Sequence, residues 1–428
     1  MKQFRTHPHQ NTASRAAPPA WQHGLIVMLL ICWGPAYRAL LDKLWVWGGG
    51  LSLVGQWAQL QASADLVGAP AFAGIGIGLT VLTAQKPAAQ HMALLLAGFA
   101  AALLCTTPML LALLCAPALV GQWLQLSPAL HGNLPLAGLA GWLGIVYGLL
   151  SGYWLGRQQH GRVLLLSIAS AAPALLVLAA SGALAMSERP ELFLRVGVAV
   201  GLLGNLSLAA VGLRWYLRTP QAGVQLSASL RLLLRYVPAG LSIGLLTPLS
   251  GLVIRSTLAS QLGWDAAGSA TALWRASDWI VSGAAGVLYF HYLPWLSQQV
   301  QQGPVWPALR HIGQRVTLPG AISLLALFVL QDQVLPALYS SQLALPWQTT
   351  ALFWGGDALR IASATLLYAL FALHASKAIA WGEWLSQPLL AALLLLGAAH
   401  SLPLTGAAHV MTYFVYAAFN FWAVRRCA

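Results

Sequence analysis

Six basic residues lie inside hydrophobic segments of this chain, namely Arg38, Lys43, Arg195, Arg255, Arg275 and Arg360. The chain otherwise avoids charge, since only 7% of its residues are Asp, Glu, Lys or Arg. An arginine at the centre of a lipid bilayer costs about 2.5–3.5 kcal/mol on insertion scales, so such residues tend to face the protein interior or a water-filled cavity. A strongly apolar chain that keeps several cations inside is therefore predicted to bind an anion.

Two of these arginines have an aspartate three residues away. Arg275 precedes Asp278, and Asp357 precedes Arg360. Residues at i and i+3 of a helix lie on the same face, where opposite charges partly neutralise one another. Two interpretations stand: each is an internal ion pair that locks the helices together, or each presents a polar surface to a central cavity.

The other arginines need partners from elsewhere. Arg38 has Asp42 at i+4, whereas Arg255 has no acid at helical spacing on its own segment. Asp65 and Glu383 are candidate partners from other helices. Asp65, or more weakly Asp42, could instead bind a coupling proton or sodium ion.

Two basic residues and the intramembrane histidines are expected to have no chemical role. Arg195 and Lys43 lie near predicted helix ends, where long basic side chains reach the lipid headgroups. Histidines inside apolar segments, such as His409, are interpreted as packing or interfacial residues.

The composition indicates a membrane protein that crosses the bilayer many times. Of the 428 residues, 58% are hydrophobic, against about 45–50% in soluble domains. At roughly 20 residues per spanning helix, the length accommodates about twelve helices. Hydropathy and the Gly and Pro residues between apolar segments place these helices at 24–46, 53–82, 91–115, 135–156, 163–186, 192–214, 236–260, 267–296, 316–335, 349–373, 378–399 and 403–424.

The distribution of basic residues predicts the orientation. With these helices, 15 of the 22 Lys and Arg residues fall on the side of the N-terminus, and only Arg189 falls outside the membrane on the other side. The positive-inside rule then places both termini in the cytoplasm. The net charge of +13 is explained by contact with anionic membrane lipids, so no nucleic-acid partner is expected.

The longest basic loop divides the chain near its middle. The predicted organisation is a cytoplasmic tail (1–20), an N-terminal six-helix bundle (21–217), a basic cytoplasmic linker (218–235) and a C-terminal six-helix bundle (236–428). Pro35 precedes Arg38 in the first helix, and Pro248 precedes Arg255 in the seventh. This faint repetition is typical of transporters built from two similar halves around a central cavity.

The residues do not indicate an enzyme. The longest external loop, 116–133, contains one histidine and no acid, and neither a paired-carboxylate motif nor a nucleophile motif occurs. The four cysteines form no metal-binding pattern. No catalytic residue, metal or cofactor is therefore expected, apart from a coupling proton or sodium ion.

Several ordered blocks of the chain resemble the Wzx-type lipid-linked oligosaccharide flippases, the family of the O-antigen and enterobacterial common antigen translocases. The resemblance rests on Gly263-Trp264-Asp265-Ala266-Ala267-Gly268, Leu273-Trp274-Arg275-Ala276-Ser277-Asp278, Tyr292-Leu293-Pro294-Trp295-Leu296-Ser297 and Trp354-Gly355-Gly356-Asp357-Ala358-Leu359-Arg360-Ile361. It is clearest from Arg255 to Arg426, and 116–133 departs from the family pattern.

The resemblance implies the fold of the multidrug/oligosaccharidyl-lipid/polysaccharide exporter superfamily, which consists of two six-helix bundles in a V around a cavity. It also implies a Gram-negative inner-membrane protein whose substrate is a polyprenyl pyrophosphate carrying a short glycan. A polysaccharide polymerase and a chain-length regulator are the partners expected on the same basis.

These expectations combine into one hypothesis. Arg38, Arg255, Arg275 and Arg360 bind the pyrophosphate, and Asp278 and Asp357 hold the arginines in position. The protein is then a flippase for an O-antigen or related repeat unit that works by alternating access. The alternatives are a cation-coupled multidrug exporter of the same superfamily and a membrane glycosyltransferase or polymerase of the same pathway.

Overall fold

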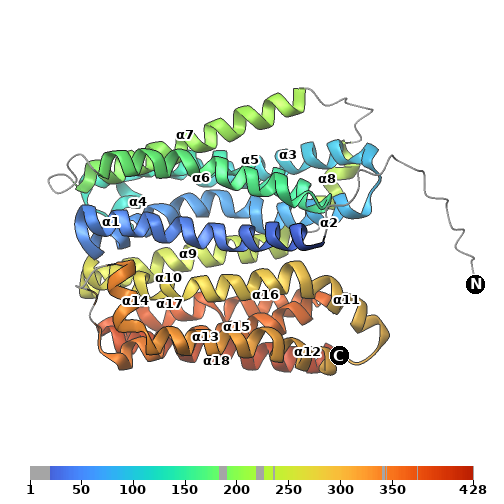
Figure 1. Cartoon of the computed structure of the whole chain (residues 1–428). Coiled ribbons are helices and arrows are strands. Elements are labelled where there is room, and N and C mark those ends of the chain that lie inside the picture. The colour runs from blue at the N-terminus through green and yellow to red at the C-terminus, as the bar shows by residue number, and fades with distance from the viewer. Residues whose placement is uncertain are drawn as a thin grey trace, which may run out of the picture.

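The computed structural model describes residues 20–182, 190–217, 226–234, 237–339, 343, 345–373 and 375–427. Every regular element among these residues is a helix (Figure 1). The all-α class predicted from hydropathy is therefore confirmed.

The N-terminal half consists of α1 (Ala20–Pro70), η1 (Ala71–Gly76), α2 (Ile77–Gln85), η2 (Ala88–Gln90), α3 (His91–Cys115), α4 (Pro117–Trp123), η3 (Pro128–Leu130), α5 (Asn133–Gly156), α6 (His160–Gly182) and α7 (Pro190–Leu217). The short helix α8 (Leu226–Leu234) follows, within the predicted linker, and lies against α3. Most of the expected tail and the rest of the linker lie outside the described residues.

The C-terminal half consists of α9 (Val237–Leu262), α10 (Trp264–Val287), η4 (Leu288–Tyr292), α11 (Leu293–Gln302), α12 (Val305–Ile312), η5 (Gly313–Thr317), α13 (Leu318–Val329), α14 (Gln331–Leu338), α15 (Trp347–Ala372), α16 (Ser376–Trp384), α17 (Gln387–Leu395), η6 (Ala398–His400) and α18 (Leu402–Cys427). The two halves lie one above the other in Figure 1.

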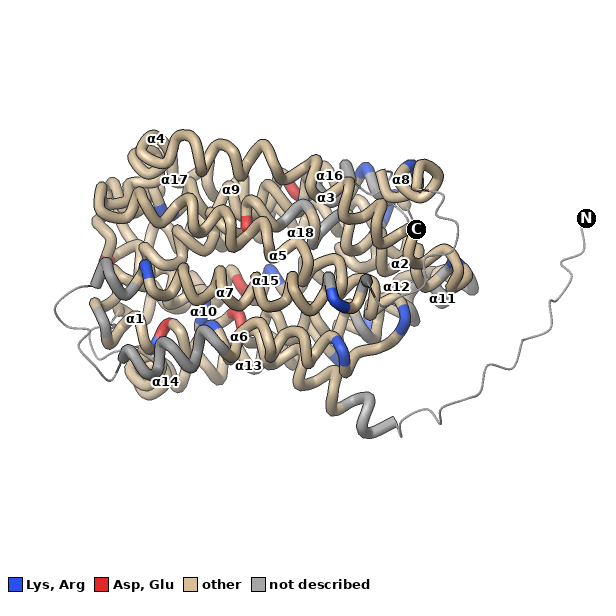
Figure 2. The backbone as a smooth tube through the Cα atoms, turned by 90° about the horizontal axis from the view of Figure 1, so that it is seen from above, with Lys and Arg blue, Asp and Glu red and all other residues tan. Residues whose placement is uncertain are grey.

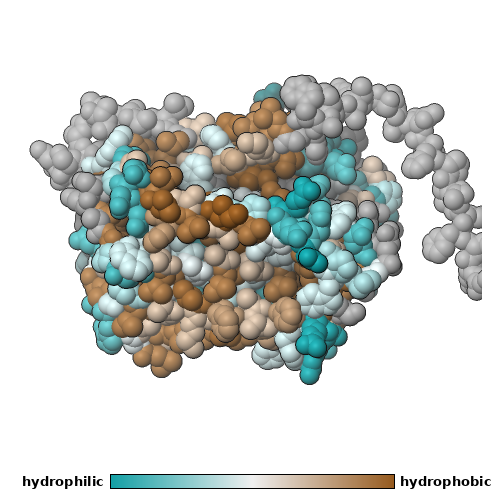
Figure 3. Space-filling model, turned by 60° about the horizontal axis from the view of Figure 1, so that its bottom comes forward, coloured by the Kyte–Doolittle hydropathy of each residue, from teal (hydrophilic) through white to brown (hydrophobic). Residues whose placement is uncertain are grey.

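Several of these helices continue into the next one through a π-helical turn or a kink. Counted in this way, the described residues form twelve long helical segments, with short helices between some of them. Six of them are long and apolar enough to cross a membrane by length and composition alone. In the face shown in Figure 3, hydrophobic residues cover the middle and hydrophilic residues lie toward both ends. This distribution suits a protein surrounded by lipid.

Basic residues gather at one end of the helical bundle. Figures 1 and 2 place α8, α11 and α12 at the same end as the C-terminus, and most of the Lys and Arg positions lie there. We call this the basic end. The clustering is the one that the positive-inside pattern predicted from sequence.

The predicted break between the first two helices occurs at the glycines. Gly49 and Gly50 have non-helical backbone angles inside α1, and Gly50 has a φ of 73°. A positive φ is unfavourable for residues with a Cβ, so the glycine permits the sharp change of direction. The chain therefore crosses the bundle twice within α1.

Two predicted boundaries were wrong. The segment Val305–Ile312 falls between the predicted helices 267–296 and 316–335, where a basic loop was expected, but it is helix α12. Its Val305, Leu309 and Ile312 side chains are buried while Arg310 is exposed, so an amphipathic helix was mistaken for a polar loop. The external loop 116–133 likewise contains α4 and η3.

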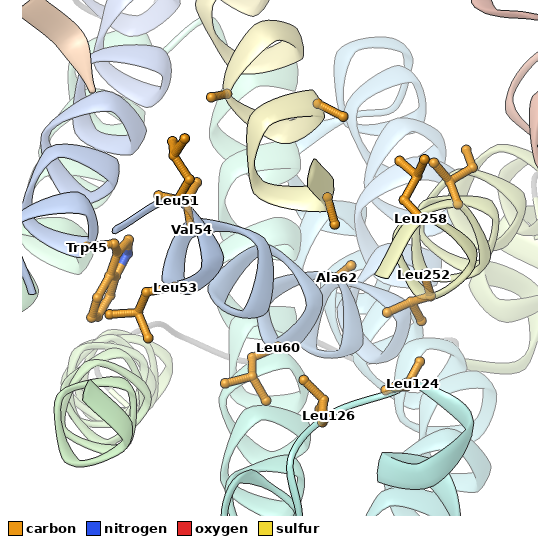
Figure 4. Close-up of a cluster of buried hydrophobic side chains, with 14 of the residues drawn as sticks. Trp45, Leu51, Leu53, Val54, Leu60, Ala62, Leu124, Leu126, Leu252 and Leu258 are labelled. Atoms are coloured by element: carbon orange, nitrogen blue, oxygen red, sulfur yellow. The ribbon is translucent and has the colours of Figure 1, made fainter. Parts of the chain in front are cut away.

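The largest hydrophobic core joins the two halves. Figure 4 shows Trp45 and Leu53 from α1 and Leu124 from the end of α4, together with Leu252 and Leu258 from α9. Trp45 and Leu53 lie on either side of the α1 kink at Gly49 and Gly50. The two halves are therefore packed against each other there.

Two glycines permit a close backbone approach between the halves. A Cβ atom on Gly268 of α10 would overlap the carbonyl oxygen of Leu51 in α1, and a Cβ on Gly55 would lie 3.0 Å from the Gly268 nitrogen. Gly283, on the same helix α10, has open space at its Cβ position.

We predict that Gly268→Ala lowers the free energy of unfolding by about 1–3 kcal/mol, because the added methyl group forces α10 away from α1. Gly283→Ala is the matched control and should leave stability unchanged or raise it by up to about 1 kcal/mol, since alanine favours helix. Thermal unfolding of the purified protein in detergent measures both. If Gly268→Ala unfolded at the same temperature as the wild type, the close approach of α10 and α1 would be contradicted.

Candidate functional site

A cavity of about 590 Å³ lies between the two halves. Its walls come from α1 of the N-terminal half and from α9, α10, α15 and α17 of the C-terminal half. The polar residues that line it are Arg38, Gln61, Asp65, Thr247, Arg255, Thr271, Arg275, Asp278, Arg360 and Gln387. All four arginines that the sequence proposed for substrate binding are thus brought together.

Arg275 links the two halves at the wall of this cavity. Its Nη1 atom pairs with Oδ1 of Asp42 in α1, and its Nη2 atom donates to Oε1 of Gln61 at 2.8 Å. The Asp42 side chain is completely buried, and its Oδ2 atom has no hydrogen-bond partner among the described residues. Arg275 is therefore the principal compensation for the charge of Asp42.

Arg255 is held by an amide instead of an acid. Its Nε atom donates to Oε1 of Gln59 at 3.0 Å. The Nε2 atom of Gln59 in turn donates to Ser256 Oγ at 2.8 Å and to the Leu252 carbonyl oxygen at 3.1 Å. This network orients the guanidinium of Arg255, and no described carboxylate lies within 4.0 Å of it.

Arg360 binds an aspartate from a neighbouring helix. Its Nη1 atom lies 3.0 Å from Oδ1 of Asp278 in α10 and 3.8 Å from Oδ1 of Asp357 in α15. The guanidinium also lies over the ring of Tyr413, 6.0 Å from its centroid. The predicted Asp357–Arg360 pair exists, while Arg275 and Asp278 each pair across helices.

Asp357 is buried behind Arg360. It accepts a hydrogen bond from Ser277 Oγ at 2.5 Å, and the Nε2 atom of His409 lies 3.1 Å from its Oδ1 atom. His409 also contacts the rings of Trp274, Phe353 and Tyr413. The sequence interpretation of His409 as a packing residue is incomplete, because its ring also binds the carboxylate that helps to position Arg360.

The arginine is the more exposed member of every ion pair at this site. The Arg275 side chain is 13% exposed and Asp42 is 0% exposed. The Arg360 side chain is 34% exposed, against 24% for Asp278 and 0% for Asp357. The acids therefore stabilise the arginines from behind while the positive groups face the cavity.

Arg38 and Asp65 complete the charged lining. Asp65 is exposed to the cavity and lies within the electrostatic reach of Arg38, Arg255 and Arg275. Within the described part of the chain, Arg38, Arg255 and Asp65 form no ion pair at 4.0 Å or less. The lining thus contains four arginines and only two aspartates.

The two remaining basic residues lie outside this cavity. The Nζ atom of Lys43, which was expected to reach the headgroups, donates to the carbonyl oxygens of Ala337 at 2.7 Å and Tyr339 at 3.1 Å, across the two halves. Arg195 is exposed, and its Nη2 atom donates to the Ala129 carbonyl oxygen at 2.7 Å. No group of three potential metal ligands occurs among the described residues.

Solved structures with the same fold are found, although no protein-family model and no curated protein matches the chain. An inward-facing multidrug resistance MATE family transporter of the MOP superfamily gives a TM-score of 0.68 at 13% identity, over 94% of this chain and 98% of that one. The chain has the fold of the MATE transporters.

Two further structures extend this comparison. The lipid II flippase MurJ, in an inward closed conformation, gives a TM-score of 0.67 at 10% identity, over 94% of this chain and 87% of that one. A MOP superfamily transporter from Pyrococcus furiosus, described as having a binding pocket of reverse polarity, gives a TM-score of 0.63 at 11% identity, with 94% of each chain covered. The fold is thus shared by drug transporters and a lipid flippase.

We predict that Arg275→Gln lowers the free energy of unfolding by about 3–5 kcal/mol, because it leaves the buried Asp42 carboxylate without its partner. Asp42→Asn combined with Arg275→Gln should recover most of this loss, since neither charge then remains. Denaturant unfolding of the two single variants and the double variant measures the coupling. Additive effects of the two substitutions would show that the ion pair is not formed.

Proposed function

We propose that this protein is a flippase that moves a polyprenyl-pyrophosphate-linked oligosaccharide, such as an O-antigen or related repeat unit, across the bacterial inner membrane. It would alternate between states in which the central cavity opens to either side. Both termini would lie in the cytoplasm, and the substrate would enter from the inner leaflet.

The observation that carries this proposal is the exposure of the arginines. Arg38, Arg255, Arg275 and Arg360 all line the cavity, and each acid paired with one of them is less exposed than the arginine. Guanidinium groups bind phosphate oxygens with two parallel hydrogen bonds, which suits a pyrophosphate. The large apolar exterior would leave the polyprenyl tail in lipid.

The aspartates have two roles in this proposal. Asp278 and Asp357 hold Arg360 in place and moderate its charge, so that the substrate is also released. Asp42 holds Arg275 in place in the same way. Because Asp42 is already paired, Asp42 is the weaker candidate for ion coupling. Asp65 is the better candidate, because it is exposed to the cavity and forms no ion pair at 4.0 Å or less in the described part of the chain.

A cation-coupled multidrug exporter is the second candidate, and the fold likeness to MATE transporters favours it. The lining counts against it, because an organic cation would meet four arginines and only two aspartates.

A membrane glycosyltransferase or polymerase has less support, since the similar solved structures are transporters and a flippase. A polymerase and a chain-length regulator are instead proposed as partners.

We predict that Arg255→Gln abolishes export of the surface glycan, whereas Arg255→Lys keeps part of it. The lysine retains the charge but cannot make the paired contacts of a guanidinium. Glycan export in cells that depend on this protein is the measurement, with the amount of protein in the membrane determined in parallel.

Arg195→Gln is the matched control, because Arg195 is exposed outside the central cavity. It should export normally. Normal export by Arg255→Gln would contradict the proposal, and resistance to organic cations that depends on the protein would favour the multidrug alternative.

A further inference from the structure

A second cavity, of about 470 Å³, lies inside the N-terminal half. It is enclosed by α1, α5, α6 and α7, whereas the central cavity is lined on this half by α1 alone. Its polar and aromatic lining residues are Trp33, Tyr37, Tyr147, Ser151, Ser167, Ser170 and Asn205. The volume falls within the range of small-molecule sites, about 300–1,000 Å³.

The chemistry of this cavity differs from that of the central one. None of the described residues that line it is charged. Its hydroxyl, amide and indole groups are instead held by specific bonds. Trp33 Nε1 donates to the Ser167 carbonyl oxygen at 3.2 Å, Tyr147 OH lies 2.6 Å from Ser167 Oγ, and Asn205 Nδ2 donates to the Ala140 carbonyl oxygen at 2.8 Å. The rings of Trp33 and Tyr147 are thus fixed in orientation.

One hydroxyl in this cavity is left without a partner. Ser151 is 8% exposed, and its Oγ atom makes no hydrogen bond within the described structure. Serines in helices usually donate to a carbonyl one turn back. Ser167 and Ser170 do so, to Val163 and Ser167. A buried hydroxyl without such a bond costs free energy, so Ser151 is poised to bond to a ligand or a water molecule in the cavity.

The linings of the two cavities come into contact on α1, at Gly34 and Arg38. Gly34 lines the N-terminal cavity, and Arg38, one helical turn later, lines the central cavity. The Nη2 atom of Arg38 lies 3.9 Å from the position that a Cβ on Gly34 would take, so the guanidinium lies against this glycine. A ligand whose phosphate binds Arg38 could therefore extend an uncharged group past Gly34.

We propose that the N-terminal cavity binds a neutral sugar residue of the lipid-linked glycan; this inference rests on the flippase function proposed above. The rings of Trp33 and Tyr37 offer apolar surfaces to the C–H face of a sugar ring. The Ser151 hydroxyl and the Asn205 amide offer hydrogen bonds to its hydroxyl groups. The pyrophosphate remains in the central cavity, at the arginines.

Other occupants fit the lining less well. A polyprenyl or acyl chain would leave the buried Ser151 hydroxyl without a partner, which is costly in a dry environment. An organic or inorganic cation would find no carboxylate among the described lining residues. A neutral, hydroxyl-rich ligand satisfies both the polar groups and the aromatic faces.

The test compares two probes, polyprenyl pyrophosphate and the same lipid carrying one N-acetylglucosamine, bound to the full-length protein in nanodiscs. The wild type should bind the sugar-bearing lipid at least about tenfold more tightly than the bare lipid. Tyr37→Leu combined with Ser151→Ala should remove most of this preference, and so should Trp33→Leu, while binding of the bare lipid is kept. Ser207→Ala is the control, because Ser207 lies exposed on α7 outside this cavity.

Equal binding of the two probes by the wild type would overturn the inference, as would a preference that both cavity variants retain. Retained binding of the bare lipid shows that a variant is folded. Failure of the flippase proposal itself has a different signature: the wild type then binds neither lipid, or Arg255→Gln binds the bare lipid as well as the wild type does.

Discussion

The ion pair between Arg275 and Asp42 is the contact on which the arrangement of the two halves depends. A charge inside a bilayer is tolerated only with a partner, and the partner of Arg275 comes from the opposite half of the chain. The pair therefore compensates two charges and fixes α10 against α1 at once. Gly268 and Gly55 allow the backbones to approach beside it, and Lys43 adds bonds to Ala337 and Tyr339 across the same boundary.

This constraint also explains the polarity of the central cavity. An aspartate that is buried behind its arginine neutralises part of the charge without being available to a ligand. Asp42 and Asp357 occupy such positions, so the cavity presents guanidinium groups to its interior. The uncharged N-terminal cavity begins one helical turn from Arg38. In the proposed function, the charged and neutral parts of the substrate would therefore occupy separate cavities.

Much of the fold could be predicted from the sequence, because hydropathy and helix breaks are local properties. The twelve helices and the break at Gly49 and Gly50 follow from them. The four cavity arginines were identified because charge is rare in the apolar segments. The Asp357–Arg360 pair was identified from its helical spacing, but the partner of Arg275 was not, since Arg275 and Asp42 are 233 positions apart and only packing brings them together. His409 was interpreted as a packing residue for the same reason, as its bond to Asp357 spans 52 positions.

The central claim is that the cavity selects an anionic lipid-linked substrate over a cation. The most direct measurement is transport by the purified protein in liposomes, with a fluorescent lipid-linked glycan on a pyrophosphate and an organic cation supplied in parallel. The account predicts that the pyrophosphate lipid crosses the bilayer faster than in protein-free liposomes, and that Arg255→Gln removes this difference. Transport of the organic cation without movement of the lipid would contradict it.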